Sequence, residues 1–199
     1  MSLHKRIADQ MREVVAGSQS SVTQAFLAEW PHDGRIVERA PAVLRVLNWL
    51  PQLLGGACDR TEALTRLVVE NAYGLDWRQT YTPAEFGPGF LERYGWTEII
   101  GERGVFVSDR IAAGILMLGP DVEYPTHSHD AEEIYVPLSG IAEWAQGSDA
   151  LQNRRPGELI HHPSGMPHAM KTGREPLLAL YVWRAGNLTQ KSVIAPRRK

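Results

Sequence analysis

The sequence of 199 residues has little cysteine, no long apolar run and almost no net charge. Its single cysteine, Cys58, excludes an internal disulfide and any zinc site built from several cysteines. With 21 basic and 23 acidic residues, nothing favours binding to nucleic acid or to an anionic membrane. No apolar run reaches the roughly 18 residues of a membrane span, and the charged start lacks a secretory signal. These absences indicate a soluble, cytoplasmic protein, and its expected partner, a small molecule, must be argued from a site.

The first part of the chain has the apolar spacing of helices. Apolar residues recur three or four positions apart in segments 22–30, 43–50 and 64–72, which prolines and a Gly-Gly pair separate. The sequence therefore predicts a helical extension over residues 1–85 that packs on the following domain, with a homodimer contact as the other use of these helices. Segment 80–90 has two prolines and two glycines and is expected to be a loop.

From residue 86 onward the pattern changes. Short apolar or alternating runs follow one another, each bounded by Gly, Pro, Asp or Ser. This rhythm is typical of an antiparallel sandwich or barrel. We therefore expect a mainly β fold over residues 86–199.

Histidines gather in this second half. Five of the seven lie between residues 127 and 168. His127, His129 and Glu133 are separated by even numbers of residues, so on extended strands their side chains share one face. Imidazole nitrogens with one carboxylate are ligands expected for Fe(II), Mn(II), Co(II), Ni(II) or Zn(II). The cluster therefore predicts a site for one divalent transition metal.

The spacing of the cluster resembles the two cupin motifs. Segment 127–140, HSHDAEEIYVPLSG, has the fixed positions of the first motif, although the gap after Gly119 is longer than usual. Segment 157–168, GELIHHPSGMPH, has those of the second, with Thr172 in place of the usual asparagine. The resemblance implies a C-terminal cupin barrel, a double-stranded β-helix or jelly roll, preceded by the helical extension. Its metal ligands would be His127, His129, Glu133 and His168.

Two further histidines, His161 and His162, adjoin the second motif. A single histidine on a strand is more often a core or surface residue than a ligand. We therefore leave both out of the expected ligand set.

One family combines these features. The segment YPTHSHDAEEIYVPLSG, with the later GMPH and LYVW segments and a helical extension, resembles the cupin dimethylsulfoniopropionate (DMSP) lyases, most closely the Q type of marine bacteria. The resemblance covers the C-terminal half by motif and the N-terminal half by length and helical character. It implies a metal-dependent carbon–sulfur lyase that cleaves DMSP to dimethyl sulfide and acrylate by β-elimination.

The resemblance also implies roles for aromatic residues. Tyr135 and Tyr124 are candidate bases, with Tyr135 preferred, because a nearby divalent cation lowers the pKa of a phenol. Packing of the barrel interior is the alternative role for both. Tyr124 and Trp183 match positions that line the substrate pocket. Tyr181 shares a strand face with Trp183 and offers a further aromatic surface to a sulfonium cation.

Two other functions stay open at this point. A cupin with several His and Glu ligands also suits an Fe(II) dioxygenase, or a lyase, acting on another small carboxylate. A ligand-sensing cupin without catalysis is the third reading, although the sequence has no helix-turn-helix signature and no basic patch.

Overall fold

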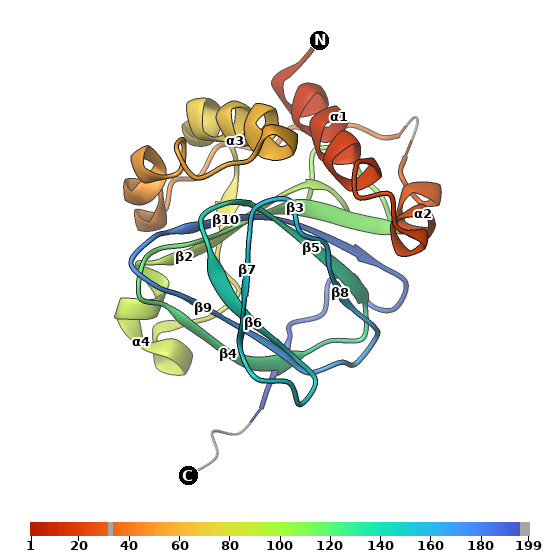
Figure 1. The fold of residues 1–199 in the computed structure, drawn as a ribbon. Helices are drawn as coiled ribbons and strands as arrows, with labels where there is room; N and C mark the ends of the chain where they lie inside the picture. Colours follow the sequence, from red (N-terminus) through yellow and green to blue (C-terminus); the bar gives the residue numbers. More distant parts are fainter. Residues whose placement is uncertain (32–33, 196–199) are drawn as a thin grey trace.

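Two antiparallel sheets face each other across a barrel in the computed structural model, which describes residues 1–31 and 34–195 (Figure 1). The larger sheet has the strand order β1-β2-β3-β10-β5-β8. Its strands are β1 (Trp77–Arg78), β2 (Tyr94–Ile100), β3 (Ile111–Leu118), β10 (Leu177–Arg184), β5 (Glu132–Ser139) and β8 (Ile160–His162).

The smaller sheet closes the other side of the barrel in the order β11-β4-β9-β6-β7. Its strands are β11 (Val193–Ile194), β4 (Glu123–Ser128), β9 (His168–Thr172), β6 (Ala142–Gln146) and β7 (Gln152–Arg154). The expected mainly β fold in the second half of the chain is confirmed.

The N-terminal helices cover the outer face of the larger sheet, whereas α4 lies apart from them and contacts β2 (Figure 1). The segments expected to be helical form α2, the 3-10 helix η1 and α3, so the N-terminal helices are confirmed. No helix among the described residues is long and apolar enough to cross a membrane. The helices are α1 (Leu3–Ala16), α2 (Ser21–Ala28), η1 (Arg45–Gln52), α3 (Asp59–Asn71), η2 (Ala72–Gly74) and α4 (Pro83–Leu91).

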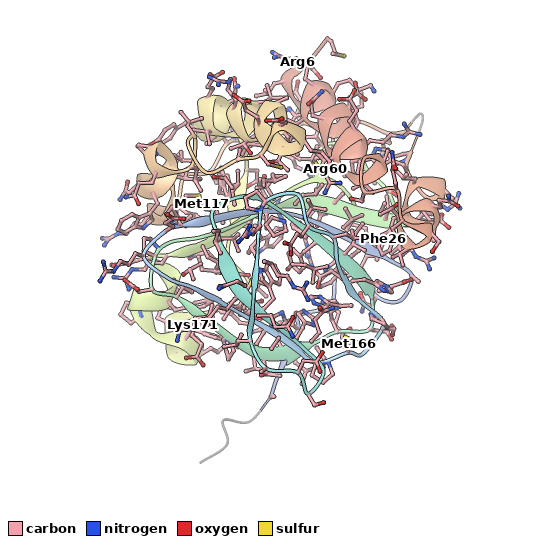
Figure 2. All side chains as sticks on the ribbon, in the orientation of Figure 1. Arg6, Phe26, Arg60, Met117, Met166 and Lys171 are labelled. Carbon is pink, nitrogen blue, oxygen red and sulfur yellow. The ribbon has the colours of Figure 1, made fainter. Side chains whose placement is uncertain are left out.

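The larger sheet is buried on both faces. On β10, Leu178 and Leu180 belong to the core beneath the helices, whereas Ala179 and Tyr181 belong to the core inside the barrel. This follows from the alternation of side chains along a strand. Side chains fill both the barrel and the layer between helices and sheet (Figure 2). The sheet is therefore clamped between two cores, and residues of one parity point at the barrel interior.

The expectation of a loop over residues 80–90 is wrong, because α4 occupies most of this segment. Thr82 caps the helix and accepts the N–H of Glu85, while the Glu85 carboxylate accepts the N–H of Thr82 at 2.9 Å. Pro83 stands at the first helical position, where proline is well tolerated. Gly87, with φ 74°, kinks the helix. The capping box formed by Thr82 and Glu85 is the sequence signal for this helix, and the neighbouring glycines and prolines concealed it.

Helix α3 is attached to the barrel by buried hydrogen bonds. Thr61 Oγ1 donates to the carbonyl of Leu138 on β5 at 2.7 Å, and Thr65 Oγ1 donates to the same oxygen at 3.3 Å. Both threonines are almost fully buried. The carbonyl needs these donors because water does not reach it.

We expect Thr61→Val to lower the free energy of unfolding by about 1–2 kcal/mol, because an isosteric apolar side chain leaves the Leu138 carbonyl with one weaker donor. Urea denaturation measures the change. Thr126→Val, at an exposed position on β4, is the matched control and should change stability by less than about 0.5 kcal/mol. Equal losses in the two variants would contradict this account of the helix attachment.

Candidate metal centre and adjoining cavity

Strand register gathers the motif residues at one end of the barrel. On the larger sheet, Glu133 of β5 lies opposite Trp183 of β10 on one side and His162 of β8 on the other. On the smaller sheet, His127 of β4 lies opposite His168 of β9. His129 follows β4 directly and lies in the turn before β5, so that it bridges the two sheets.

Glu133 is the centre of this cluster and is fully buried. Its Oε2 lies 3.1 Å from His129 Nε2 and 3.3 Å from His168 Nε2. The same oxygen lies 3.3 Å from His162 Nδ1, while Oε1 accepts the indole N–H of Trp183 at 2.5 Å. Both carboxylate oxygens are therefore held by fixed rings.

Backbone carbonyls fix the orientation of three imidazole rings. His127, His129 and His168 each hydrogen-bond through Nδ1 to a carbonyl two residues away, at 2.8, 2.9 and 2.9 Å. A carbonyl only accepts, so Nδ1 carries the proton in each ring and Nε2 faces inward. Metal-binding histidines are commonly oriented by such a bond on the other ring nitrogen.

The chemistry of the donors suits a cation. His129 and His168 already donate through Nδ1, so their close approach to Glu133 through Nε2 is attractive only with a proton or a metal ion between them. Bonds of about 2.1 Å to one ion would separate neighbouring ligand atoms by roughly 3.0–3.4 Å. The observed 3.1 and 3.3 Å fit that spacing. His129, Glu133 and His168, whose ligand atoms lie within 4.8 Å of one another, could hold a divalent metal.

The surrounding charges keep the carboxylate ionised. Burial opposes charge on Glu133, but the charge of His129 and the hydrogen bonds from the histidines hold its pKa well below the usual range. Burial also lowers the pKa of His129, yet Glu133 and the Ala131 carbonyl outweigh it and raise that pKa overall. The pKa of His127 is lowered well below its usual range, chiefly by burial. The cluster thus combines an anionic carboxylate with a neutral ring at His127.

His127 stands beside the tight group. Its ring centroid lies 4.1 Å from that of His168 and 6.4 Å from that of His129. It also stacks on Tyr124 at 4.2 Å. The group of mutually close ligand atoms consists of the other three expected ligands. His127 is thus adjacent to the cluster.

The two histidines left out of the expected set differ sharply. His161 points outward, is partly exposed and pairs with Glu132 at 2.7 Å. His162 is fully buried, contacts Glu133 and stacks on His168 at 4.0 Å. Sequence reasoning missed His162 as part of the cluster. The signal was its parity, because neighbours on a strand face opposite ways and only one of the two could reach the barrel interior.

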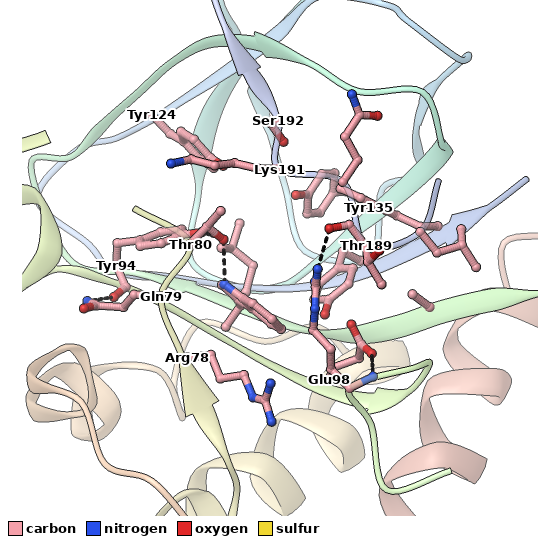
Figure 3. Close-up of a pocket in the computed structure, with 18 residues that line it drawn as sticks. Arg78, Gln79, Thr80, Tyr94, Glu98, Tyr124, Tyr135, Thr189, Lys191 and Ser192 are labelled. Atoms are coloured by element: carbon pink, nitrogen blue, oxygen red, sulfur yellow. Dashed lines mark hydrogen bonds between the residues drawn. The ribbon is translucent and has the colours of Figure 1, made fainter. Parts of the chain in front are cut away.

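A cavity of about 620 Å³ adjoins the cluster through Trp183. Figure 3 shows the residues that line it. None of its described lining residues is His129, Glu133 or His168, but Trp183 belongs to both places: it lines the cavity, stacks on His129 at 4.0 Å and donates to Glu133. The structure brings all the predicted aromatic site residues to this cavity. They are Tyr124, Tyr135, Tyr181 and Trp183.

The two candidate bases have different surroundings. The hydroxyl of Tyr124 hydrogen-bonds that of Tyr81 at 2.8 Å. Tyr135 packs against Trp144 with ring centroids 4.9 Å apart. Burial raises the pKa of both Tyr124 and Tyr135 well above the usual value, and the negative charge of Glu133 raises that of Tyr135 further. Neither phenol becomes an anion near neutral pH through the protein groups alone.

Comparison with known proteins places these features in a family. A family model described as dimethylsulfoniopropionate lyase matches residues 18–179. Dimethylsulfoniopropionate lyase DddQ of Ruegeria pomeroyi is 40% identical over 118 residues, which are 59% of this chain and 58% of that protein. DddL of Cereibacter sphaeroides is 33% identical over 150 residues, 73% of this chain and 62% of that protein. The chain thus matches less than two thirds of the length of either relative.

Solved structures agree with the sequence matches. A chain from the crystal structures of the DMSP lyases RdDddP and RnDddQII superposes with a TM-score of 0.84 at 31% identity, covering 97% of this chain and 100% of that one. The crystal structure of DMSP lyase DddQ from Ruegeria pomeroyi gives a TM-score of 0.80 at 28% identity, covering 96% of this chain and 99% of that one. The expected cupin fold is confirmed.

We expect His168→Ala to weaken binding of a divalent metal at least about tenfold, because it removes a nitrogen from the group of ligand atoms. Equilibrium dialysis against Mn(II) or Zn(II), followed by metal analysis, measures the loss. His161→Ala is the matched control, since it removes an outward-facing imidazole from β8 and should leave binding unchanged. The reverse result would show that the ligand set is wrong.

Proposed function

Because the chain belongs to the dimethylsulfoniopropionate lyase family, we propose that it is a metal-dependent carbon–sulfur lyase that cleaves DMSP to dimethyl sulfide and acrylate by β-elimination. The observation that carries this proposal is the junction formed by Trp183. This side chain joins a buried His–Glu cluster to a cavity large enough for a small carboxylate. A substrate in the cavity can therefore place one end close to the cluster.

The proposed metal ligands are His129, Glu133 and His168, with His127 as the next nearest ring. Two or three imidazole nitrogens and one carboxylate suit Fe(II), Zn(II), Mn(II), Ni(II) or Co(II). A divalent ion bound there would supply a Lewis acid for the substrate carboxylate and positive charge beside the tyrosines.

The α-proton beside a carboxylate is very weakly acidic, so the site must provide a strong base. We assign this role to Tyr135, which is buried and lines the cavity. It lies two residues after Glu133 on β5, so the two side chains share one face of the strand. The phenolate of Tyr135 takes the α-proton, that electron pair forms the C=C bond of acrylate, and the C–S bond breaks to release neutral dimethyl sulfide. Tyr124, whose hydroxyl is held by Tyr81, is the second candidate.

Aromatic faces are proposed to receive the other end of the substrate. A sulfonium cation is weakly hydrated and is attracted to the faces of aromatic rings. Tyr181 and Trp183 present neighbouring rings from the inward face of β10 to the cavity. They orient the leaving group, and Trp183 at the same time holds the carboxylate of Glu133.

Headspace detection of dimethyl sulfide tests the activity directly. Purified protein loaded with Fe(II) or Mn(II) and given DMSP should release dimethyl sulfide and acrylate in equal amounts, and a chelator should stop the release. If fully metal-loaded protein releases none and consumes oxygen with a small carboxylate, the lyase proposal is wrong and the dioxygenase reading replaces it.

We expect Tyr135→Phe to lower kcat by about 10²–10⁴-fold, because the phenyl ring keeps the packing but cannot accept a proton. The same headspace assay measures this loss, and metal content is determined in parallel. Tyr73→Phe, at an exposed position, is the matched control and should retain full activity. Near-normal turnover by Tyr135→Phe with metal bound would move the base assignment to Tyr124.

A further inference from the structure

The cavity contains a buried carboxylate that the proposed chemistry does not use. Glu98, on β2, is 6% exposed and lines the same cavity as Tyr135 and Trp183. It belongs to a strand separated from β5 by β3 and β10, so it lies away from the His–Glu cluster. Buried acidic side chains without a cationic partner are uncommon, because transferring a charge out of water is costly.

A missing side chain on the intervening strand opens the space in front of Glu98. Gly114 of β3 lies opposite Glu98 on one side and opposite Tyr181 on the other. A Cβ at this position would lie 2.0 Å from the carbonyl of Thr97 and 2.7 Å from the hydroxyl of Tyr181. Only glycine fits, so the strand position between Glu98 and Tyr181 carries no side chain. Figure 3 shows Glu98 among the residues that line the cavity.

The hydrogen bonds of Glu98 hold it in place without neutralising it. Its Oε1 accepts the backbone N–H of Arg103 at 2.7 Å. The ion pairs of the described chain do not include Glu98, whose carboxylate has no lysine or arginine nitrogen within 4.0 Å. The carboxyl group therefore has a fixed position and no ion-pair partner among the described residues.

The basic groups that line the cavity have other partners. Arg78 binds Asp76 through two nitrogens at 2.8 and 2.5 Å, and Lys191 pairs with Glu85. Arg103 donates to the carbonyl of Thr189 at 2.5 Å and lies 5.5 Å above the ring of Trp96.

Burial nevertheless dominates the titration of Glu98. It raises the pKa of this carboxyl to about 7, although the Arg103 N–H and the charges of Arg103 and Arg78 act in the opposite direction. Of the other side chains packed against it, Tyr181 on β10 stays neutral, because burial raises the pKa of its phenol well above the usual value. A cation entering the cavity would favour the ionised carboxylate.

We propose that Glu98, together with the ring of Tyr181, forms the binding site for the onium group of a zwitterionic substrate whose carboxylate is held at the metal centre. This assignment rests on the proposed function and names the group that distinguishes the substrate from other small acids. A sulfonium or quaternary ammonium group donates no hydrogen bonds. It is recognised by aromatic faces and by a negative charge at longer range, and this part of the cavity offers both.

Two probes of the same shape separate charge from size. 3-(Trimethylammonio)propanoate has a cationic head, and 4,4-dimethylpentanoate replaces the nitrogen with carbon. Binding of each to Mn(II)-loaded protein is measured by calorimetry at pH 8. The wild type should bind the cationic probe about tenfold more tightly, a difference of about 1.4 kcal/mol.

Glu98→Gln removes the charge but keeps a carbonyl oxygen that accepts the Arg103 N–H. In this variant we expect the tenfold preference to fall to about one, through weaker binding of the cationic probe alone. Glu102→Gln, at an exposed position in the turn that follows β2, is the matched control and should keep the preference. Equal effects in the two variants, or no preference in the wild type, would overturn the assignment of Glu98.

A measurement on the wild type serves if Glu98→Gln does not fold. Glu98 is ionised above its pKa of about 7 and neutral below it, so the ratio of the two affinities should fall between pH 8 and pH 5. A constant ratio would contradict the role of Glu98, whereas failure of both probes to bind would instead remove the carboxylate site on which the proposed function rests.

Discussion

A fully buried carboxylate that is kept ionised constrains the rest of this structure. Glu133 has no contact with water, and imidazole and indole nitrogens from four other segments surround its two oxygens. Removing one neighbour leaves part of a buried charge uncompensated, which typically costs several kcal/mol. The strand register, the turn that carries His129 and the orientation of Trp183 are consequently tied together. A cation at this point would complete the compensation, so metal binding and the order of this end of the barrel are coupled.

The double burial of the larger sheet explains how such a site stays rigid. Strand β10 has the helix layer on one face and the barrel interior on the other, and it pairs with both β3 and β5 along most of its length. Successive residues of β10 therefore point alternately into the barrel and toward the helices. Tyr181 and Trp183 line the cavity, whereas Val182 between them packs beneath the helices. The N-terminal helices thus support the site from outside without lining the described cavity.

The spacing of residues along one strand predicts which motif side chains share a face. It does not predict contacts that depend on how the strands pair. Even-numbered separations placed His127, His129 and Glu133 together, and the second motif added His168. The Glu98 carboxylate and the contact of His162 with Glu133 depend on which strands are neighbours and in what register, and single-strand patterns do not contain this information. Helix α4 was missed for a different reason, because its glycines and prolines outweighed a short capping signal.

Gly114 and Ala112, the two small residues on the inward face of β3, differ in whether a larger side chain fits. Gly114 does not tolerate substitution, since a Cβ at this position would lie 2.0 Å from the Thr97 carbonyl oxygen. Ala112, opposite Trp183 and also lining the cavity, already has a Cβ. A larger side chain at position 112 would reduce the volume of the cavity. Because Trp183 packs against Ala112, it would also displace the ring that donates to Glu133. Position 112 therefore couples the size of the cavity to the order of the buried carboxylate.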